Sequence, residues 1–500
     1  MQIELVGIVT LILGIATLWF GPGFGVAALA TTSLLGAAAA VKLPVLGGSS
    51  ITPGHLLLPF YIWVVGRACG GQLNLLRSFS FPSPAFWLAA FTVFAAISAV
   101  FLPRLFAGSV EVFGVARGPE SQDRVIMLTL LRPTSGNITQ SVYLVANAVL
   151  LAAAIAHVRY ANGARAVVRA VYAVIGLNIA FGIADYVTYS QGMSEVMAPI
   201  RNANYAQLNE VELYGLKRIV GSFTEGSVYG AASLVCLAFS LELWMRGVRP
   251  GFFGITSLLS LFGLVSSFSS AALGAFGVYM ILLWLRALVQ LLIGRAGPSQ
   301  LGAVLVPPLL MLIIAFALVL MPDVAATLEK FVDRLFFEKL ESESGVERST
   351  WNIYALQAFY DTWLLGAGAG SIRSSSYAIG LLANVGLIGT ALMLAYLAGL
   401  FGAVFRTEAR GSAFAHVHAA SWACVTMLGS AALAGATIDL GLLFFIMSGF
   451  ILGHARVPGR DVAGAGAKAG MNTRLAAADG GRAGVRPVMA TSTLERNRPA

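Results

Sequence analysis

The chain has 500 residues, of which 58% are hydrophobic and only 11% are charged, whereas about a quarter of the residues in soluble domains are charged. This composition excludes an ordinary soluble enzyme and indicates an integral membrane protein. The net charge of +9 follows the loops between apolar segments and forms no patch, so no nucleic-acid partner is expected. Cys69, Cys236 and Cys424 are isolated in or beside apolar segments, which predicts neither a disulfide framework nor a zinc site.

Continuous apolar runs recur along nearly the whole chain, and each is long enough to cross a hydrocarbon core of about 30 Å as a helix. Because the runs do not alternate with polar residues, they exclude a transmembrane β-barrel. The predicted fold class is all-α, a polytopic membrane domain over residues 1–455 with about 12–13 spans. In chain order these are expected at residues 3–20, 25–41, 51–66, 84–102, 141–158, 167–185, 227–245, 251–268, 270–293, 301–320, 377–400, 415–434 and 438–455.

Basic residues concentrate in alternate loops, for example at Arg67, Arg159 and Arg246, and in the C-terminal tail. The positive-inside rule therefore places these loops and the tail in the cytoplasm and the N-terminus on the outer side. Lys42 falls on the outer side, against this trend. Residues 456–500 are rich in Gly, Ala and Arg without apolar periodicity, which predicts a disordered basic cytoplasmic tail.

Three polar segments, 103–140, 186–226 and 321–376, lie on the outer side in this topology, so we expect the protein to work at its outer surface. The first segment shows no readable pattern. The second ends in "LKRIVGSFTEGSVYG", where Lys217 and Arg218 stand just outside a span, against the charge trend. They are interpreted either as partners of nearby carboxylates or as contacts to a phosphate-bearing ligand.

The third segment is expected to contain two amphipathic helices. Its first part carries apolar residues at helical spacing (Leu328, Phe331 and Leu335), which predicts a helix lying on the membrane surface. Ser349 and Thr350 then predict an N-cap, with Arg348 at the start of the helix that follows. The apolar face of that helix, expected to anchor in the lipid head groups, consists of Trp351, Ala355, Ala358, Phe359 and Trp363.

The next motif is "GAGAGS", with glycines at 366, 368 and 370. A dinucleotide-binding turn needs a preceding strand and a βαβ unit, and neither is indicated in these membrane surroundings. The glycines predict a loop whose backbone approaches another group closely. A helix is expected to start near Ser374, where Arg373 and three serines supply donors for an anion. A plain Gly/Ser entry loop explains the same residues.

The residues "RIVGSFTEGSVYG", "ERSTWNIYALQAF", "GAGAGS" and "LLANVGLIG", together with the number of spans, resemble the O-antigen polymerase/ligase superfamily. This superfamily contains the Wzy-type polysaccharide polymerases and the WaaL-type ligases. The resemblance covers roughly residues 217–400. It implies a GT-C-like, metal-independent glycosyltransferase without a cofactor, multi-pass in the bacterial inner membrane with its catalytic loops in the periplasm.

The resemblance further implies that a glycan is taken from an undecaprenyl-diphosphate carrier. Arg218 and Arg348 match the family's two diphosphate-handling arginines, which gives them catalytic roles. A general base for the acceptor hydroxyl would come from Glu225, Glu347 or Asp361, the outward carboxylates near the arginines, although the role of arginine counter-ion suits each of them better. Glu225 is counted with the two arginines as catalytic. The expected substrate-binding residues are Lys217, Trp351, Arg373, Ser375 and Tyr377.

The expected function is polymerisation of lipid-linked oligosaccharide repeats into exopolysaccharide, capsule or O-antigen. The partners are the lipid-linked donor and acceptor and the membrane lipids, and a chain-length regulator is left open. Ligases of the family carry a His-Asn-type motif where this chain has Ser375, and the large loop contains no histidine, which favours the polymerase branch over a ligase. A lipid-linked glycan flippase or other transporter is the alternative from another class, and a non-enzymatic scaffold is a further one.

Overall fold

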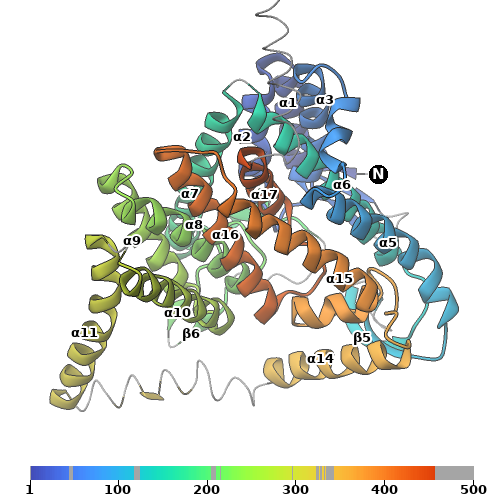
Figure 1. The fold of residues 1–500 in the computed structure, drawn as a ribbon. Coiled ribbons are helices and arrows are strands. Elements are labelled where there is room, and N and C mark those ends of the chain that lie inside the picture. The colour runs from blue at the N-terminus through green and yellow to red at the C-terminus, as the bar shows by residue number, and fades with distance from the viewer. Residues whose placement is uncertain are drawn as a thin grey trace, which may run out of the picture. The chain divides into compact units, whose positions relative to one another are not determined.

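The computed structural model describes residues 2–43, 49–117, 124–160, 162–203, 210–213, 215–294, 297–321 and 343–455, and within 322–342 only residues 326, 329, 330 and 333. These belong to one compact unit, Met1–Ala455, and most of them are helical (Figure 1). The predicted tail after residue 455 lies outside the described residues, as do Leu328, Phe331 and Leu335 of the predicted surface helix.

Seven of the described helices are long and apolar enough to cross a membrane, and the bent pair Pro53–Ala68 and Leu73–Phe79 makes an eighth if it is one span. The seven are α5 (Pro84–Leu105), α6 (Ser135–Arg159), α7 (Gly163–Ser190), α8 (Gly226–Met245), α10 (Ser270–Leu292), α15 (Tyr377–Phe405) and α16 (Ser412–Ala434). The protein is therefore a mostly helical, polytopic membrane protein, as predicted. The remaining main helices are α1 (Leu5–Phe20), α2 (Pro22–Thr32), α3 (Pro53–Ala68), α4 (Leu73–Leu76), α9 (Pro250–Ser266), α11 (Pro298–Leu320), α14 (Glu343–Asp361) and α17 (Leu442–His454).

Several predicted spans are shorter than expected. The helices α1, α9 and α17 are apolar but have only 16, 17 and 13 residues. The predicted span 25–41 is wrong, because α2 ends at Thr32 and the chain continues into strand β2 (Val41–Leu43). The intervening alanines are fully buried, and Ala37 N–H donates to the Ser222 carbonyl (3.2 Å). Their apolar character reflects burial in protein rather than contact with lipid.

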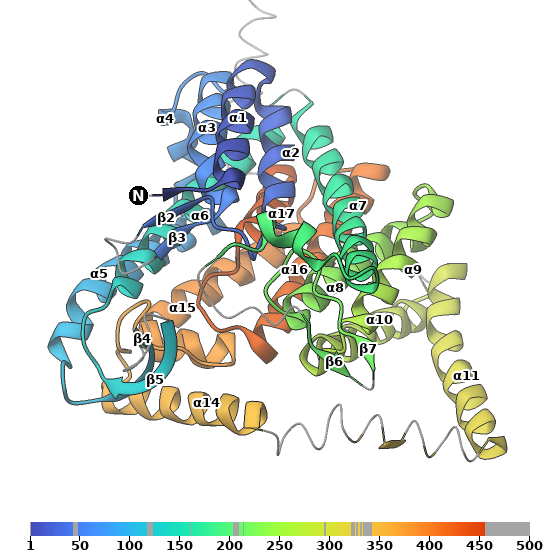
Figure 2. The same ribbon diagram turned by 180° about the vertical axis from the view of Figure 1, so that it is seen from behind.

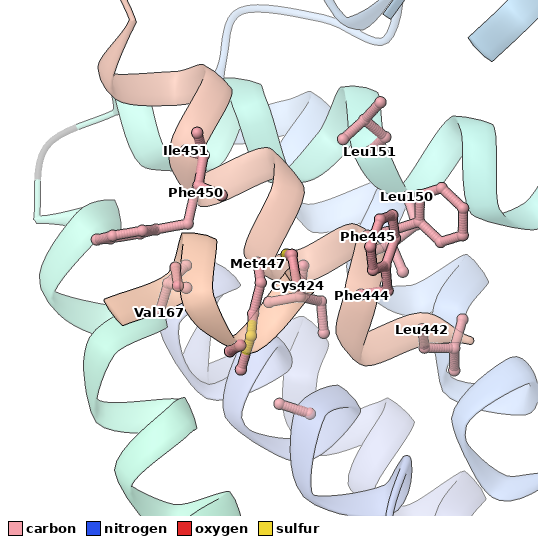
Figure 3. Close-up of a cluster of buried hydrophobic side chains, with 14 of the residues drawn as sticks. Leu150, Leu151, Val167, Cys424, Leu442, Phe444, Phe445, Met447, Phe450 and Ile451 are labelled. Atoms are coloured by element: carbon pink, nitrogen blue, oxygen red, sulfur yellow. The ribbon is translucent and has the colours of Figure 1, made fainter. Parts of the chain in front are cut away.

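Helix α17 is an element of the protein core rather than a span in contact with lipid. It packs against α2, α6, α7, α15 and α16, and ten of its residues from Leu442 to Leu452 are buried. Figure 3 shows Phe444, Phe445 and Phe450 among side chains of the neighbouring helices. Gly449 lets α17 approach α6, because a Cβ there would lie 2.3 Å from that of Ala154. A helix that is apolar on all sides is expected to be buried in this way.

Short sheets connect the helices. Strands β1 (Gln2–Ile3), β2 and β3 (Ser49–Ile51) form one antiparallel sheet, and β6 (Glu212–Leu213) pairs with β7 (Leu216–Lys217). The segment that showed no pattern in the sequence contains a hairpin of β4 (Glu111–Arg117) and β5 (Arg124–Leu130), with Val112 opposite Thr129. Helix α14 packs on β4, as Figure 2 also shows.

The predicted anchoring face of α14 is turned toward protein. Ala355 and Ala358 are fully buried and Phe359 is 6% exposed, and the two alanines share a core with Val112 of β4. The expectation that this face lies in the head groups is therefore wrong for Ala355, Ala358 and Phe359, because the hairpin that covers them was not foreseen. Trp363, which was assigned to the same face, is 76% exposed. The apolar side chains that α14 exposes are Val346, Ile353 and Tyr360.

The predicted start of this helix is also wrong. Helix α14 already includes Glu343, so Ser349 and Thr350 lie inside it, and Thr350 Oγ1 donates to the Val346 carbonyl (2.8 Å). This backward bond is what Ser and Thr form inside a helix, where they cannot act as caps. Arg348 therefore lies within the helix, five residues after its first residue, and not at its start.

The glycine loop approaches the protein's own backbone. Gly366, Gly368 and Gly370 all have φ between +81° and +95°, the region that glycine adopts without strain. A Cβ on Gly368 would lie 2.7 Å from the Ser98 carbonyl oxygen of α5, and one on Gly370 would lie 2.4 Å from the Gly136 oxygen of α6. The close approach predicted from the motif is therefore made to α5 and α6.

Two asparagines hold this loop. Asn384 Oδ1 accepts from Ser371 N (3.1 Å) and its Nδ2 donates to the Ile372 carbonyl (3.0 Å). Asn137 Nδ2 donates to the Ala369 carbonyl (2.9 Å). Helix α15 breaks at Gly386 (φ 62°, ψ −164°) where the loop backbone pairs with it, since Gly368 N–H donates to the Asn384 carbonyl (2.9 Å).

Candidate functional site

Arg218 lies over the first turn of α8. Its Nε donates to the Ser267 carbonyl (2.8 Å). A Cβ on Gly226, the first residue of α8, would lie 2.5 Å from that Nε, so the guanidinium can take this position only because residue 226 has no side chain. Glu225 is the N-cap residue of α8, and its carboxylate lies within electrostatic reach of the Arg218 guanidinium.

Arg373 is carried by the segment between the glycine loop and α15. Its backbone N–H donates to the Phe113 carbonyl of β4 (2.9 Å), which ties the segment to the hairpin. Its Nε is buried and has no hydrogen-bond partner among the described residues. Buried donors nearly always have a hydrogen-bond partner. We therefore expect this nitrogen to donate to an acceptor atom of a ligand.

Arg348 is brought to the same place by α14. The Asn352 Oδ1 on α14 accepts from Ser375 N (2.8 Å), so the helix and the Arg373 segment are joined directly. Trp351, three residues after Arg348 and therefore on the same side of the helix, has a buried indole Nε1 with no partner in the described part of the chain. Its ring lies 6.5 Å from that of Phe113.

Electrostatics show that these groups converge. Burial lowers the pKa of Arg218, Glu225 raises it, and Arg348 lowers it. Burial likewise lowers the pKa of Arg373, and Glu225 raises it. Both arginines stay charged, because the guanidinium pKa starts so high. Glu225 therefore lies within reach of two arginines and Arg348 within reach of one, although the three come from positions as distant as 218 and 373.

The three guanidinium groups remain available to bind a ligand. Within the described ranges, the ion pairs closer than 4.0 Å involve other residues. Glu225 instead accepts a hydrogen bond from the Ser227 hydroxyl. Two arginines near one carboxylate, with Arg348 near Arg218, leave an excess of positive charge. Planar guanidinium groups match the oxygens of phosphate bidentately. The arrangement can bind an anion of more than one charge. We call Arg218, Arg348, Arg373, Trp351 and Glu225 the arginine site.

Lys217 pairs with a carboxylate, which is one of the two interpretations that its sequence position allowed. It is 7% exposed and its Nζ lies 3.5 Å from Asp185 Oδ1, with the Tyr189 ring 4.5 Å below it. Asp185 also pairs with Arg201 (2.6 Å) and accepts from Val220 N (2.7 Å). The structure thus gives Lys217 a buried ion pair, which shapes the segment leading to Arg218.

The last two predicted contacts lie at the edge of the site. Ser375 is buried, and its backbone is held by Asn352. Tyr377 is the first residue of α15, and its hydroxyl is buried without a partner among described residues. Sequence reasoning identified all three arginines. It missed Asn137, Asn352 and Asn384, because a bond such as Asn137 to Ala369 leaves no local pattern.

Comparison with protein-family models, with curated proteins and with solved structures finds no match to this chain. Among the described residues there is also no group of three or more His, Cys, Asp or Glu side chains placed to hold a metal ion. The interpretation of the arginine site therefore depends on its own residues and chemistry.

Proposed function

We propose that the protein is a membrane glycosyltransferase that joins oligosaccharide repeats carried on undecaprenyl diphosphate, at the periplasmic face of the bacterial inner membrane. The observation that carries this proposal is that Arg218 and Arg373 lie within reach of Glu225 and that Arg348 lies within reach of Arg218. Two buried donors of this site, Trp351 Nε1 and Arg373 Nε, have no partner among the described residues. Such a site suits a lipid-linked diphosphate.

The transfer reaction requires few catalytic groups beyond those of this site. A diphosphate is a good leaving group, and charge develops on it as the bond to the anomeric carbon breaks. Fixed guanidinium groups in a partly buried site stabilise that charge without reorganising. Glu225 fits the role of counter-ion, which holds two arginines in position before the diphosphate arrives. Trp351 Nε1–H and Arg373 Nε–H are further donors for phosphate oxygens, since neither has a partner among the described residues.

Two alternative functions, a transporter and an O-antigen ligase, can be compared with this proposal. A transporter is expected to use ionisable residues in the middle of its spans. The buried carboxylates Asp185 and Glu242 instead lie near the ends of α7 and α8, and both are paired, Glu242 with Arg246 (2.6 Å) and Arg286 (2.8 Å). An O-antigen ligase would use the same diphosphate contacts, so only the product distinguishes it from a polymerase.

The first test is binding of farnesyl diphosphate, a short soluble polyprenyl diphosphate, to the purified protein. A charge-assisted hydrogen bond contributes about 1.5–3 kcal/mol, so Arg218→Gln, Arg348→Gln and Arg373→Gln should each weaken binding about 10- to 150-fold. Arg165→Gln is the control, because Arg165 is exposed near the start of α7. Farnesyl monophosphate should bind less tightly than the diphosphate.

The second test uses a strain that lacks the protein and is complemented with each variant. Surface polysaccharide is resolved by gel, and membrane levels of the variants are compared. Loss of long chains with single repeats still at the surface supports a polymerase. Long chains that stay on the lipid carrier would indicate a ligase, and repeats held on the cytoplasmic face a flippase. Full-length polymer from all three arginine variants would exclude the diphosphate role.

A further inference from the structure

A second polar cluster surrounds Asp439, in the loop between α16 and α17. Its Oδ1 accepts from Asn147 Nδ2 of α6 (2.7 Å) and from Gly441 N (2.8 Å). Asn147 is 1% exposed, so this carboxylate is joined to the interior of the helical unit. Neither residue has a part in the arginine site described above.

A histidine from α3 belongs to the same cluster. Asp439 acts electrostatically on the His55 ring, which stacks on Tyr143 of α6 with 4.2 Å between the ring centroids. His55 Nδ1 lies 2.8 Å from Thr52 Oγ1. The ring is therefore fixed on one face by Tyr143 and on one edge by Thr52.

Three buried polar atoms of this cluster have no hydrogen-bond partner in the part of the chain that the structure describes. They are His55 Nε2, Asn147 Oδ1 and the Tyr377 hydroxyl. Asp439 also acts electrostatically on Tyr377. The Asp439 carboxylate therefore interacts with all three residues that carry these atoms. Buried polar groups are nearly always partnered, and three unpartnered groups around one carboxylate indicate a ligand that presents several hydroxyls.

The cluster adjoins the arginine site through the chain itself. Tyr377 follows Arg373 by four residues, which span at most about 14 Å. In the same region Gln140 of α6 packs against the glycine loop, where a Cβ on Gly370 would lie 3.0 Å from its Cγ. A group bound at the arginine site and a second group bound around Asp439 would therefore lie side by side.

We propose that the Asp439 cluster is the acceptor site of the glycosyl transfer, in which Asn147 and Tyr377 bind sugar hydroxyls and His55 takes the proton of the attacking hydroxyl. This rests on the proposed function. The acceptor oxygen forms a bond to the anomeric carbon of the donor, and the bond from that carbon to the diphosphate oxygen breaks. The electron pair leaves with the diphosphate, and the hydroxyl proton moves to His55 Nε2.

The surroundings of His55 suit this step. The tautomer that donates from Nδ1 to Thr52 leaves the lone pair on Nε2, which is the nitrogen without a partner. Once Nε2 is protonated, the Asp439 carboxylate stabilises the imidazolium. Asp439 is therefore a positioning residue, and His55 the residue that touches the acceptor.

The test compares His55→Gln and Tyr377→Phe with His157→Gln. His157 is also buried on a predicted span, but it is hydrogen-bonded to the Tyr61 hydroxyl (2.9 Å), so it reports the general effect of losing a buried histidine. Tyr377→Phe removes only a hydroxyl that has no partner within the described residues, so it should fold as the wild type does. Chain growth is followed in membranes supplied with lipid-linked repeats extracted from the deletion strain, and farnesyl diphosphate binding is measured on the same proteins.

We expect His55→Gln to slow chain growth at least 100-fold, in the range of a lost general base, and Tyr377→Phe to slow it about tenfold. Farnesyl diphosphate should bind both variants within twofold of wild type. Chain growth at the wild-type rate in both would overturn the acceptor site, while the arginine variants still decide the proposed function. Weaker farnesyl diphosphate binding in both variants would also overturn it, because the cluster would then belong to the donor site.

Discussion

At the scale of single residues, Asp185 is a buried charge that contacts several groups. Its side chain is 2% exposed, and it faces Arg201 and Lys217, whose side chains are 5% and 3% exposed. It also accepts from the backbone N–H groups of Val220 and Gly221 (2.7 and 3.1 Å). One carboxylate thus fixes the turn that follows Arg218 and forms ion pairs with two cations.

Asp185→Asn should therefore destabilise the protein more than an ordinary charge substitution does. The amide keeps the size of the side chain but removes the carboxylate that pairs with the buried Arg201 and Lys217, a loss of about 3–5 kcal/mol. The measurement is the midpoint of thermal unfolding of the purified protein in detergent. Glu4→Gln breaks the surface pair with Lys42 (3.0 Å) and should leave the midpoint unchanged. Equal midpoints for both variants would contradict the structural role given to Asp185.

Lys217 shows what could and could not be predicted from the sequence for a single residue. The sequence revealed a basic pair against the charge trend, and Arg218 does reach the arginine site. It could not reveal that Lys217 pairs with Asp185, 32 positions earlier, because two charges this far apart in the chain carry no spacing rule. The nearer Glu210 and Glu212 are the candidates that proximity suggests.

At the scale of elements, the glycine loop and the break in α15 form one structural unit. Gly386 has φ 62° and ψ −164°, a region that only glycine occupies without strain. A Cβ there would also lie 2.4 Å from the carbonyl oxygens of Leu364 and Leu365. Arg373 depends on this docking, because the loop leads directly to it.

Gly386→Ala should release the loop from α15. The backbone conformation alone costs about 1–3 kcal/mol for a residue with a side chain, and the overlap with two carbonyl groups adds to this. Farnesyl diphosphate binding should fall together with thermal stability. Gly277→Ala in α10 is the control, since a Cβ there meets no atom within 4 Å and alanine favours a helix over glycine. A Gly386→Ala protein that binds as Gly277→Ala does would show that the loop does not position Arg373.

The helices were predicted well where a continuous apolar run was long enough to cross the membrane, as for α5, α7, α10 and α16. It failed where tertiary contacts decide the structure. The β4–β5 hairpin went unseen, so the buried face of α14 was assigned to lipid. The alanines before β2 were taken as part of a span because burial in protein and burial in lipid select the same residues.

At the scale of the whole molecule, the arginine site lies at one end of the spanning helices. We call it the site end, defined by the first residues of α8 and α15. The last residues of these helices are followed by Arg246 and Arg406, at the opposite end. Lys42, which contradicted the charge trend in the sequence, is paired with Glu4 (3.0 Å), so its charge is balanced locally. The positive-inside rule then predicts that the site end faces out of the cytoplasm.

Cysteine labelling decides this orientation. Ser109 follows α5 at the site end and Ser412 begins α16 at the opposite end, and both are exposed. Cys236 and Cys424 are buried, so Cys69→Ala gives a background with little labelling of its own. In intact spheroplasts, a membrane-impermeant maleimide should label Ser109→Cys and spare Ser412→Cys until the membrane is permeabilised. The reverse pattern would place the arginine site in the cytoplasm. A transferase acting on repeats already carried across the membrane would then be excluded, because its diphosphate site would face the wrong compartment.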